Sequence, residues 1–161
     1  MSLIYLLLGT NLGNKEANLK LSKTKLLYKG IIILKESSLY ETEPWGFEHP
    51  ESFYNQVIKI ETDISPNDLL TLLLQIETEL GRVRESGEYK ARIIDMDILL
   101  YDNLVLHSDK LTIPHPKMHV RRFVLEPLCE IEPLLVHPYF NKTMIDLLNE
   151  CIDKKKVTKI F

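Results

Sequence analysis

The chain has 161 residues, 45% of them hydrophobic, which suits one compact domain over residues 1–161 with its own core. The formal net charge of −3 excludes the uniformly basic surface of a nucleic-acid binder. The longest apolar runs fall far short of the roughly 18 residues that a membrane helix needs, and no secretion signal is recognisable. Cys129 and Cys151 do not form a close pair, so we expect reduced thiols in a cytoplasmic protein.

Strand and helix signals alternate through the first half of the chain. A buried strand is expected over residues 3–9, and two β-branched stretches, residues 31–40 and 53–63, predict further strands. Asn14 is a good helix N-cap, and Gly30 stands where that helix should end. Between them, side chains recur at helical spacing at Ala17, Leu21, Thr24 and Tyr28.

A leucine-rich helix is the clearest element. Ser65 and Pro66 provide its N-cap and first residue, Gly81 closes it, and we assign Leu74 to the core. A strand over residues 93–101 and a turn after it predict a hairpin into residues 104–106. Prolines then leave room for only two short helices, near residues 118–129 and 143–151. This order predicts an α+β fold with helices on one face of a sheet and a C-terminal extension.

Two acids interrupt the strand of residues 93–101. Side chains two residues apart on a strand share a face, so Asp95 and Asp97 project together. Buried carboxylates need a cation, and Mg²⁺ is typically held by one or two carboxylates together with substrate phosphates. The same pattern also occurs on the solvated face of an edge strand, so the spacing alone leaves both interpretations open.

The loop before these acids runs from Arg82 to Arg92 and is rich in arginine. Guanidinium groups bind phosphate oxygens in a bidentate manner, which favours phosphoryl transfer over a charged surface loop. No Walker-type loop or protein-kinase signature is present. Further on, His115 and His119 could form half of a zinc site, but no paired cysteines complete it. We expect His119 to be a structural residue.

Six ordered blocks of sequence resemble one enzyme family. They are Gly9–Gly13, Tyr40–Pro44, Phe53–Asn55, Gly81–Arg84, Arg92–Leu99 and Pro114–Phe123. Together they are similar to 6-hydroxymethyl-7,8-dihydropterin pyrophosphokinase of folate synthesis, over the stretch from Leu3 to about Pro133. The resemblance implies a ferredoxin-like α/β sandwich, with a mainly antiparallel sheet and helices packed on it, in a monomeric cytoplasmic enzyme. It also implies transfer of pyrophosphate from ATP to the pterin hydroxymethyl group, with release of AMP.

The resemblance assigns roles to individual residues. Asp95 and Asp97 would bind two Mg²⁺ ions, and Arg82 and Arg92 would stabilise the transferring group. The pterin would be bound by stacking aromatics and polar edge groups at Thr42, Pro44, Trp45, Phe53, Asn55, Tyr89 and Phe123. ATP would be bound at Glu77, Arg84, the Ile98 backbone, Lys110, Thr112, His115 and Arg121.

Some interpretations stay open at this point. Core packing is the simpler interpretation of Phe53 from the sequence pattern alone, and Tyr54 could equally face the ligand. Lys90-Ala91 replaces the Gly-Pro that the family usually carries before the acids. Two other functions are possible: a different Asp-x-Asp metal enzyme, such as a nucleotide-sugar transferase or nuclease, and a pterin- or nucleotide-binding module without catalysis.

Overall fold

The computed structural model describes residues 1–42, 52–81 and 93–160. Its elements, in chain order, are β1 (Ser2–Thr10), α1 (Lys15–Tyr28), β2 (Ile32–Glu36), β3 (Tyr40–Thr42), β4 (Phe53–Thr62), α2 (Pro66–Glu79), β5 (Asp95–Tyr101), β6 (Leu106–His107), β7 (Thr112–Ile113), the 3₁₀ helix η1 (Met118–Val120), α3 (Arg122–Ile131), α4 (Met144–Glu150) and β8 (Val157–Lys159).

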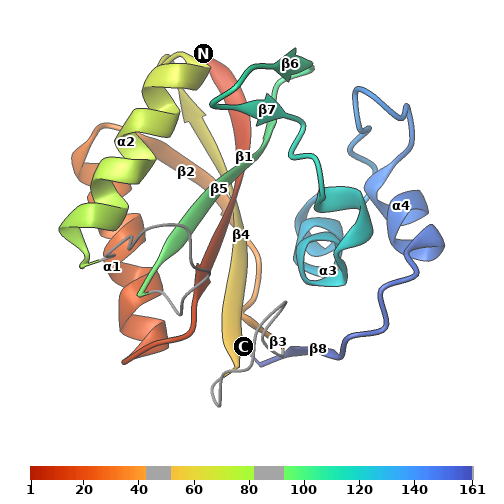
Figure 1. Cartoon of the computed structure of the whole chain (residues 1–161), viewed down its shortest axis with the longest axis horizontal. Coiled ribbons are helices and arrows are strands. Elements are labelled where there is room, and N and C mark those ends of the chain that lie inside the picture. Colours follow the sequence, from red (N-terminus) through yellow and green to blue (C-terminus); the bar gives the residue numbers. More distant parts are fainter. Residues whose placement is uncertain (43–51, 82–92, 161) are drawn as a thin grey trace.

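One antiparallel sheet forms the centre of the molecule (Figure 1). β1 lies between β4 and β5, both β2 and β3 pair with β4, and β8 extends the sheet beyond β3. This arrangement confirms the predicted α+β class with helices packed on a mainly antiparallel sheet. The long stretch predicted over residues 31–40 is divided between β2 and the start of β3.

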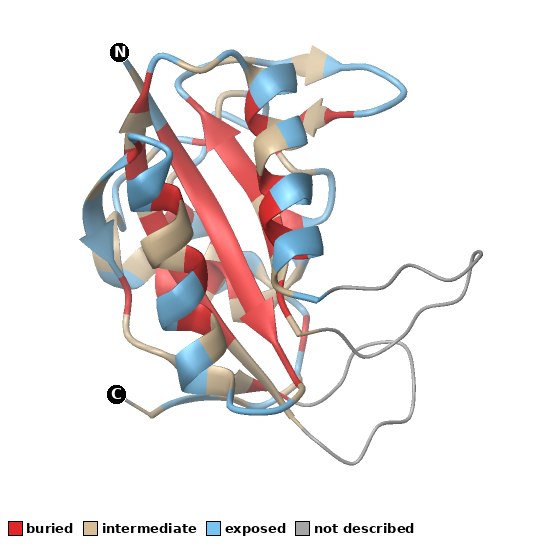
Figure 2. Ribbon diagram, turned by 90° about the vertical axis from the view of Figure 1, so that its left-hand side faces the viewer, coloured by how far each residue is buried: buried red, intermediate tan, exposed pale blue. Residues whose placement is uncertain are grey.

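The helices cover both faces of the sheet, so the prediction that they lie on one face is wrong. α1 and α2 pack on one side, and α3 and α4 pack on the other (Figure 1). The reason is visible in β1, which is buried on both sides because its apolar residues do not alternate with polar ones (Figure 2). Ile4, Leu6 and Leu8 join the α1/α2 core, whereas Tyr5 and Leu7 join the α3/α4 core.

The predicted hairpin from β5 into residues 104–106 is also wrong. The turn at Asp102 closes against the start of β1 instead: its N–H donates to the Leu3 carbonyl, and its carboxylate accepts from the Leu3 N–H, each at 2.8 Å. Because this turn is fixed to β1, the chain leaves β5, and β6 pairs with β7 in a separate hairpin.

Both predicted N-caps are confirmed. The Asn14 side chain accepts a hydrogen bond from the Ala17 N–H at 3.1 Å, and Ser65 accepts one from the Asp68 N–H at 3.4 Å. The buried faces were predicted less well. α1 buries Leu19, Ser22 and Leu26 and leaves Leu21 and Tyr28 exposed. α2 buries Leu69, Leu73, Ile76 and Glu77, so Leu74 falls outside this stripe and is exposed, against its assignment to the core.

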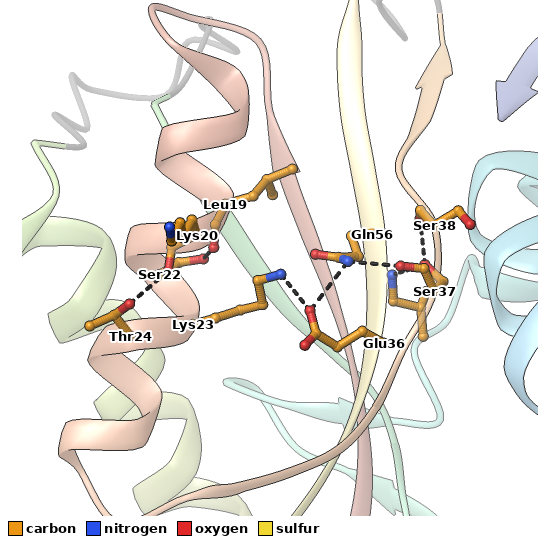
Figure 3. Close-up of polar contacts among 10 residues, drawn as sticks. Leu19, Lys20, Ser22, Lys23, Thr24, Glu36, Ser37, Ser38 and Gln56 are labelled. Atoms are coloured by element: carbon orange, nitrogen blue, oxygen red, sulfur yellow. Dashed lines mark hydrogen bonds and ion pairs between the residues drawn. The ribbon is translucent and has the colours of Figure 1, made fainter. Parts of the chain in front are cut away.

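A polar network ties α1 to β2 and β4 (Figure 3). Lys23 forms an ion pair with Glu36, and the buried Gln56 amide donates to the Ser37 carbonyl at 2.8 Å. The Ser37 hydroxyl in turn accepts from the Val57 N–H at 3.0 Å. This network fixes the chain where it passes from β2 to β3.

Two long-range contacts hold α3 on its face of the sheet. Asp153 accepts a hydrogen bond from the Arg122 N–H at 3.0 Å and so caps the start of the helix. Near the other end, the Glu130 carboxylate accepts from the Tyr40 hydroxyl at 2.8 Å and from the Ser38 N–H at 2.8 Å. α3 is therefore fixed at its start by the C-terminal segment and near its end by β3.

His137 is buried beside α4, and its Nδ1 accepts from the N–H groups of Tyr139 and Phe140, each at 3.2 Å. Burial, with a smaller effect of nearby His119, lowers the pKa of His137 from 6.5 to about 4. His119 itself packs on the Phe140 ring, with centroids 4.6 Å apart. This packing fits the structural role expected for His119.

The lowered pKa of His137 predicts a pH-dependent stability. Between pH 4 and 6.5 the unfolded chain binds a proton at this residue that the folded chain does not, so the free energy of unfolding should rise with pH across this window and then level off. His137→Asn keeps an acceptor for the two N–H groups but cannot titrate. Urea unfolding from pH 5 to 7.5 should show a smaller slope for the variant, and equal slopes would contradict the assignment.

No helix in the described ranges is long and apolar enough to cross a membrane. Cys129 and Cys151 are both free thiols.

Candidate active site

A row of directly paired residues crosses the sheet near the end of β1. Gly9 pairs with Asn55 of β4 on one side and with Asp95 of β5 on the other, and Asn55 pairs further along with Tyr40 of β3. Directly paired residues project to the same face, so Asp95 and Asn55 lie on one face, two strand spacings or about 10 Å apart. Between them stands a residue without a side chain.

The two acids have the geometry that the sequence predicted. Asp95 and Asp97 are half-buried on the face that also carries Leu7, whereas Met96 and Ile98 are buried on the opposite face against α1 and α2. β5 is at the end of the sheet path, so the strand alone would also fit a solvated edge. The polar and aromatic groups that share this face argue for a ligand site instead.

Asn55 and Thr42 form a buried polar pair on that face. The Asn55 Nδ2 donates to the Thr42 hydroxyl oxygen at 3.0 Å, and both residues are at least 95% buried. Within the described part of the chain, the Asn55 Oδ1 accepts no hydrogen bond. A buried amide whose nitrogen is fixed in this way directs its oxygen at a defined point.

Phe53 lies two residues before Asn55 and pairs with Thr42, so it projects to the same face. Tyr54 projects to the other face, where it packs against the α1/α2 core and lies under the Lys15 ammonium at 4.9 Å. The structure thus separates the two aromatics that the sequence left open: Phe53 lies on the face of Asn55 and the acids, and Tyr54 lies on the opposite face.

Phe123 stands in the first turn of α3, on the helix layer that covers this same face. The Arg121 guanidinium carbon lies 5.6 Å from its ring centroid. Since Asp153 caps α3 at Arg122, the C-terminal segment helps to set where Phe123 stands. Phe53 and Phe123 therefore occupy the same side of the sheet.

His115 is attached to β5 by its backbone. Leu99 is the extra residue of a β-bulge opposite β1, and its carbonyl accepts from the His115 N–H at 2.9 Å. Burial, and then the neighbouring positive charge of Arg121, lower the pKa of His115 to about 4, although Asp95 acts in the opposite direction. Because its Nδ1 accepts from the Lys117 N–H at 3.1 Å, the neutral ring carries its proton on Nε2.

Glu77 of α2 contacts the backbone of β5, the strand that carries Asp95 and Asp97. Glu77 is 1% exposed, and its carboxylate accepts from the Met96 N–H at 3.0 Å, between the two acids. A second contact fixes the start of this strand, since the Thr10 hydroxyl donates to the Ile93 carbonyl. The family resemblance assigns Glu77 to the ATP side and assigns no role to Thr10, for which the glycine-threonine step after a buried strand was the available signal.

The remaining ATP-side residues lie on β5 and on the β6–β7 hairpin. The Ile98 side chain is buried in the α1/α2 core, which leaves its backbone for a ligand. Lys110 is exposed between β6 and β7, and Thr112 is half-buried on β7. Figure 1 shows this hairpin near the start of β1, at the end of β5 away from Asp95.

Six residues assigned to the site lie outside the described ranges. They are Pro44, Trp45, Arg82, Arg84, Tyr89 and Arg92, and the expectations about them stay predictions.

The sequence matches the model of one protein family, described as 7,8-dihydro-6-hydroxymethylpterin-pyrophosphokinase, over residues 5–133. A 2-amino-4-hydroxy-6-hydroxymethyldihydropteridine pyrophosphokinase from Porphyromonas gingivalis is 42% identical, over 86% of this chain and 95% of its own length. The enzyme of that name from Bacillus subtilis is 40% identical, over 81% of this chain and 78% of its own length.

Longer relatives contain the same region. The folic acid synthesis protein FOL1 of Dictyostelium discoideum is 42% identical over 88% of this chain, which spans only 21% of that protein. Among solved structures, an HPPK-DHPS protein in complex with substrates has a TM-score of 0.74 at 16% identity, over 92% of this chain and 43% of that one, and therefore supports the fold alone. The chain belongs to the 7,8-dihydro-6-hydroxymethylpterin-pyrophosphokinase family.

Proposed function

We propose that this chain transfers the pyrophosphoryl group of ATP to the hydroxymethyl oxygen of 6-hydroxymethyl-7,8-dihydropterin, on the sheet face that carries Asp95, Asp97 and Asn55. The observation that supports this most strongly is the row across the sheet, in which a buried amide and a carboxylate flank Gly9. A polar heterocycle and a charged phosphate chain need these two kinds of group side by side.

The acids fit Mg²⁺ by the chemistry of their donors. Within the described residues, no group of three or more His, Cys, Asp or Glu side chains could hold a metal ion. Asp95 and Asp97 are two half-buried carboxylates, which suit a hard cation that completes its oxygen shell with water and phosphate. We propose that Asp95 and Asp97 hold two such ions when ATP is bound, and that the ions supply charge neutralisation at the phosphates.

The pterin would stack between Phe53 and Phe123, with its edge against the buried pair. Thr42 fixes the Asn55 amide, so the Asn55 oxygen can accept from a ring N–H, and the Thr42 hydroxyl keeps its own proton for a ring acceptor. Aromatic stacking contributes apolar contact, and the paired edge contributes orientation. Pro44, Trp45 and Tyr89 complete this proposed pocket.

The ATP phosphates would lie between the acids and the segment of His115 and Arg121. Neutral His115 would donate a hydrogen bond from its Nε2–H group to a phosphate oxygen, and Arg121 would bind the phosphates as a cation. Arg82 and Arg92 would stabilise the transferring group, while Arg84, Lys110, Thr112 and the Ile98 backbone would bind the rest of the nucleotide. The hydroxymethyl oxygen would bond to the β-phosphorus as the bond to AMP breaks, so catalysis would rest on positioning and charge.

We further propose a monomeric, cytoplasmic enzyme. The free thiols of Cys129 and Cys151 support a reducing compartment.

Metal binding tests this site directly. Mn²⁺, a spectroscopic substitute for Mg²⁺, should bind weakly to the protein alone, and two ions should bind once a non-hydrolysable ATP analogue and the pterin are added, as read by paramagnetic resonance. Mg²⁺ should displace them. Tight Mn²⁺ binding that does not depend on the nucleotide, or no binding in the full mixture, would contradict the proposed metal role.

A further inference from the structure

Gly9 stands inside a strand, where glycine lowers stability unless a close approach requires it. β1 is otherwise built of large buried side chains from Ile4 to Leu8. A Cβ atom added to Gly9 would lie 2.9 Å from the Asn55 Oδ1, closer than real Cβ atoms come to an oxygen. Among the described residues, and apart from the chain neighbours Leu8 and Thr10, no other side chain comes within 4 Å of that point.

Asn55 cannot easily move away from this position. It is only 4% exposed, and its Nδ2 is bonded to Thr42 on the β3 side, so the amide extends across the sheet with its oxygen over the Gly9 backbone. At the neighbouring step of the same face, Leu7 faces Val57 and fills the corresponding space. The space left by the missing side chain of Gly9 is therefore found only where the Asn55 amide crosses β1, and not at the neighbouring step.

We infer that Gly9 is a positioning residue of the pterin site: its missing side chain allows the Asn55 amide to lie across β1 and point its oxygen at the ligand. The inference rests on the proposed pterin role of Asn55. Gly9 also pairs directly with Asn55 on one side and with Asp95 on the other, so it lies between the proposed pterin edge and the proposed metal site.

The first test is Gly9→Ala. The added methyl group displaces the end of one side chain and leaves the backbone in place, so the variant should fold. The dissociation constant for the pterin should rise roughly 5- to 100-fold, the effect of losing a directed hydrogen bond, while that for an ATP analogue should change less than about twofold. Gly30→Ala is the matched control, because Gly30 has open space and a φ of +82°. That change should lower stability without altering pterin affinity.

A double-mutant cycle then isolates the contact. If Gly9 acts through Asn55, adding Gly9→Ala to Asn55→Ala should cause no further loss of pterin affinity. Additive losses would overturn the inference. If Gly9→Ala alone fails to fold, the double variant should fold because the clash is gone, and failure of both would show that the new methyl group meets something other than Asn55.

The cycle also separates this inference from the function on which it rests. Unchanged pterin affinity in Asn55→Ala would refute the proposed pterin site itself. Weakened affinity in Asn55→Ala together with normal affinity in Gly9→Ala would refute only the role of Gly9.

Discussion

Replacing Asp97 by alanine is expected to abolish turnover and leave the fold intact. Asp95 and Asp97 are half-buried carboxylates on one face, so removing one takes away a metal ligand and relieves their mutual repulsion. Replacing a residue that only supports a metal ligand typically lowers metal affinity or activity by about 10- to 100-fold. Loss of the ligand itself should therefore lower kcat at least about 100-fold. The midpoint of thermal unfolding should hold or rise slightly. Initial rates at saturating ATP, pterin and Mg²⁺ measure the effect.

Asp63→Ala is the control for this experiment, since Asp63 is exposed and its ion pair is with the N-terminus. It removes the same charge and should leave kcat unchanged. Near-normal activity of Asp97→Ala in Mg²⁺ would remove the basis for the metal assignment and favour the interpretation of the acids as a solvated strand face.

The second large effect is expected for Asn55→Leu, which should weaken pterin binding far more than ATP binding. Leucine has a similar volume but cannot pair with a heterocycle edge, and it also leaves the buried Thr42 hydroxyl without its amide partner. An unpaired group costs about 1–3 kcal/mol, which corresponds to roughly 5- to 150-fold in the dissociation constant. Calorimetric titration with each ligand separately measures both affinities.

Gln56→Leu provides the comparison. Gln56 is the next residue and also a buried amide, but it bonds to the Ser37 carbonyl in the network beside α1 (Figure 3). Its replacement should lower stability and leave pterin affinity intact. If Asn55→Leu instead weakens the two ligands equally, Asn55 belongs to the scaffold.

Several features of the structure were predicted correctly from local sequence signals. The caps at Asn14 and Ser65 were predicted correctly because each depends on residues within one helical turn. The shared face of Asp95 and Asp97 followed from strand periodicity alone. The family resemblance then supplied Asn55, Phe53 and their proposed partners, which no local pattern could have joined.

What the sequence did not reveal depends on contacts between distant segments. Asp153 caps α3 from 31 positions along the chain, and the Asp102 turn closes on Leu3. The second helical layer had a signal, since β1 is apolar at consecutive positions and needs cover on both faces. The relation of Gly9 to Asn55 depends on the register between β1 and β4, and periodicity within one strand does not specify the register between two.

Product identity tests the central claim most directly. The protein is mixed with ATP, Mg²⁺ and 6-hydroxymethyl-7,8-dihydropterin, and the phosphorus-containing products are followed by ³¹P nuclear magnetic resonance and chromatography. The account predicts AMP and a diphosphate ester of the pterin in equal amounts, with no formation of ADP. Release of ADP, hydrolysis of ATP that does not depend on the pterin, or tight binding of both ligands with no product would contradict it.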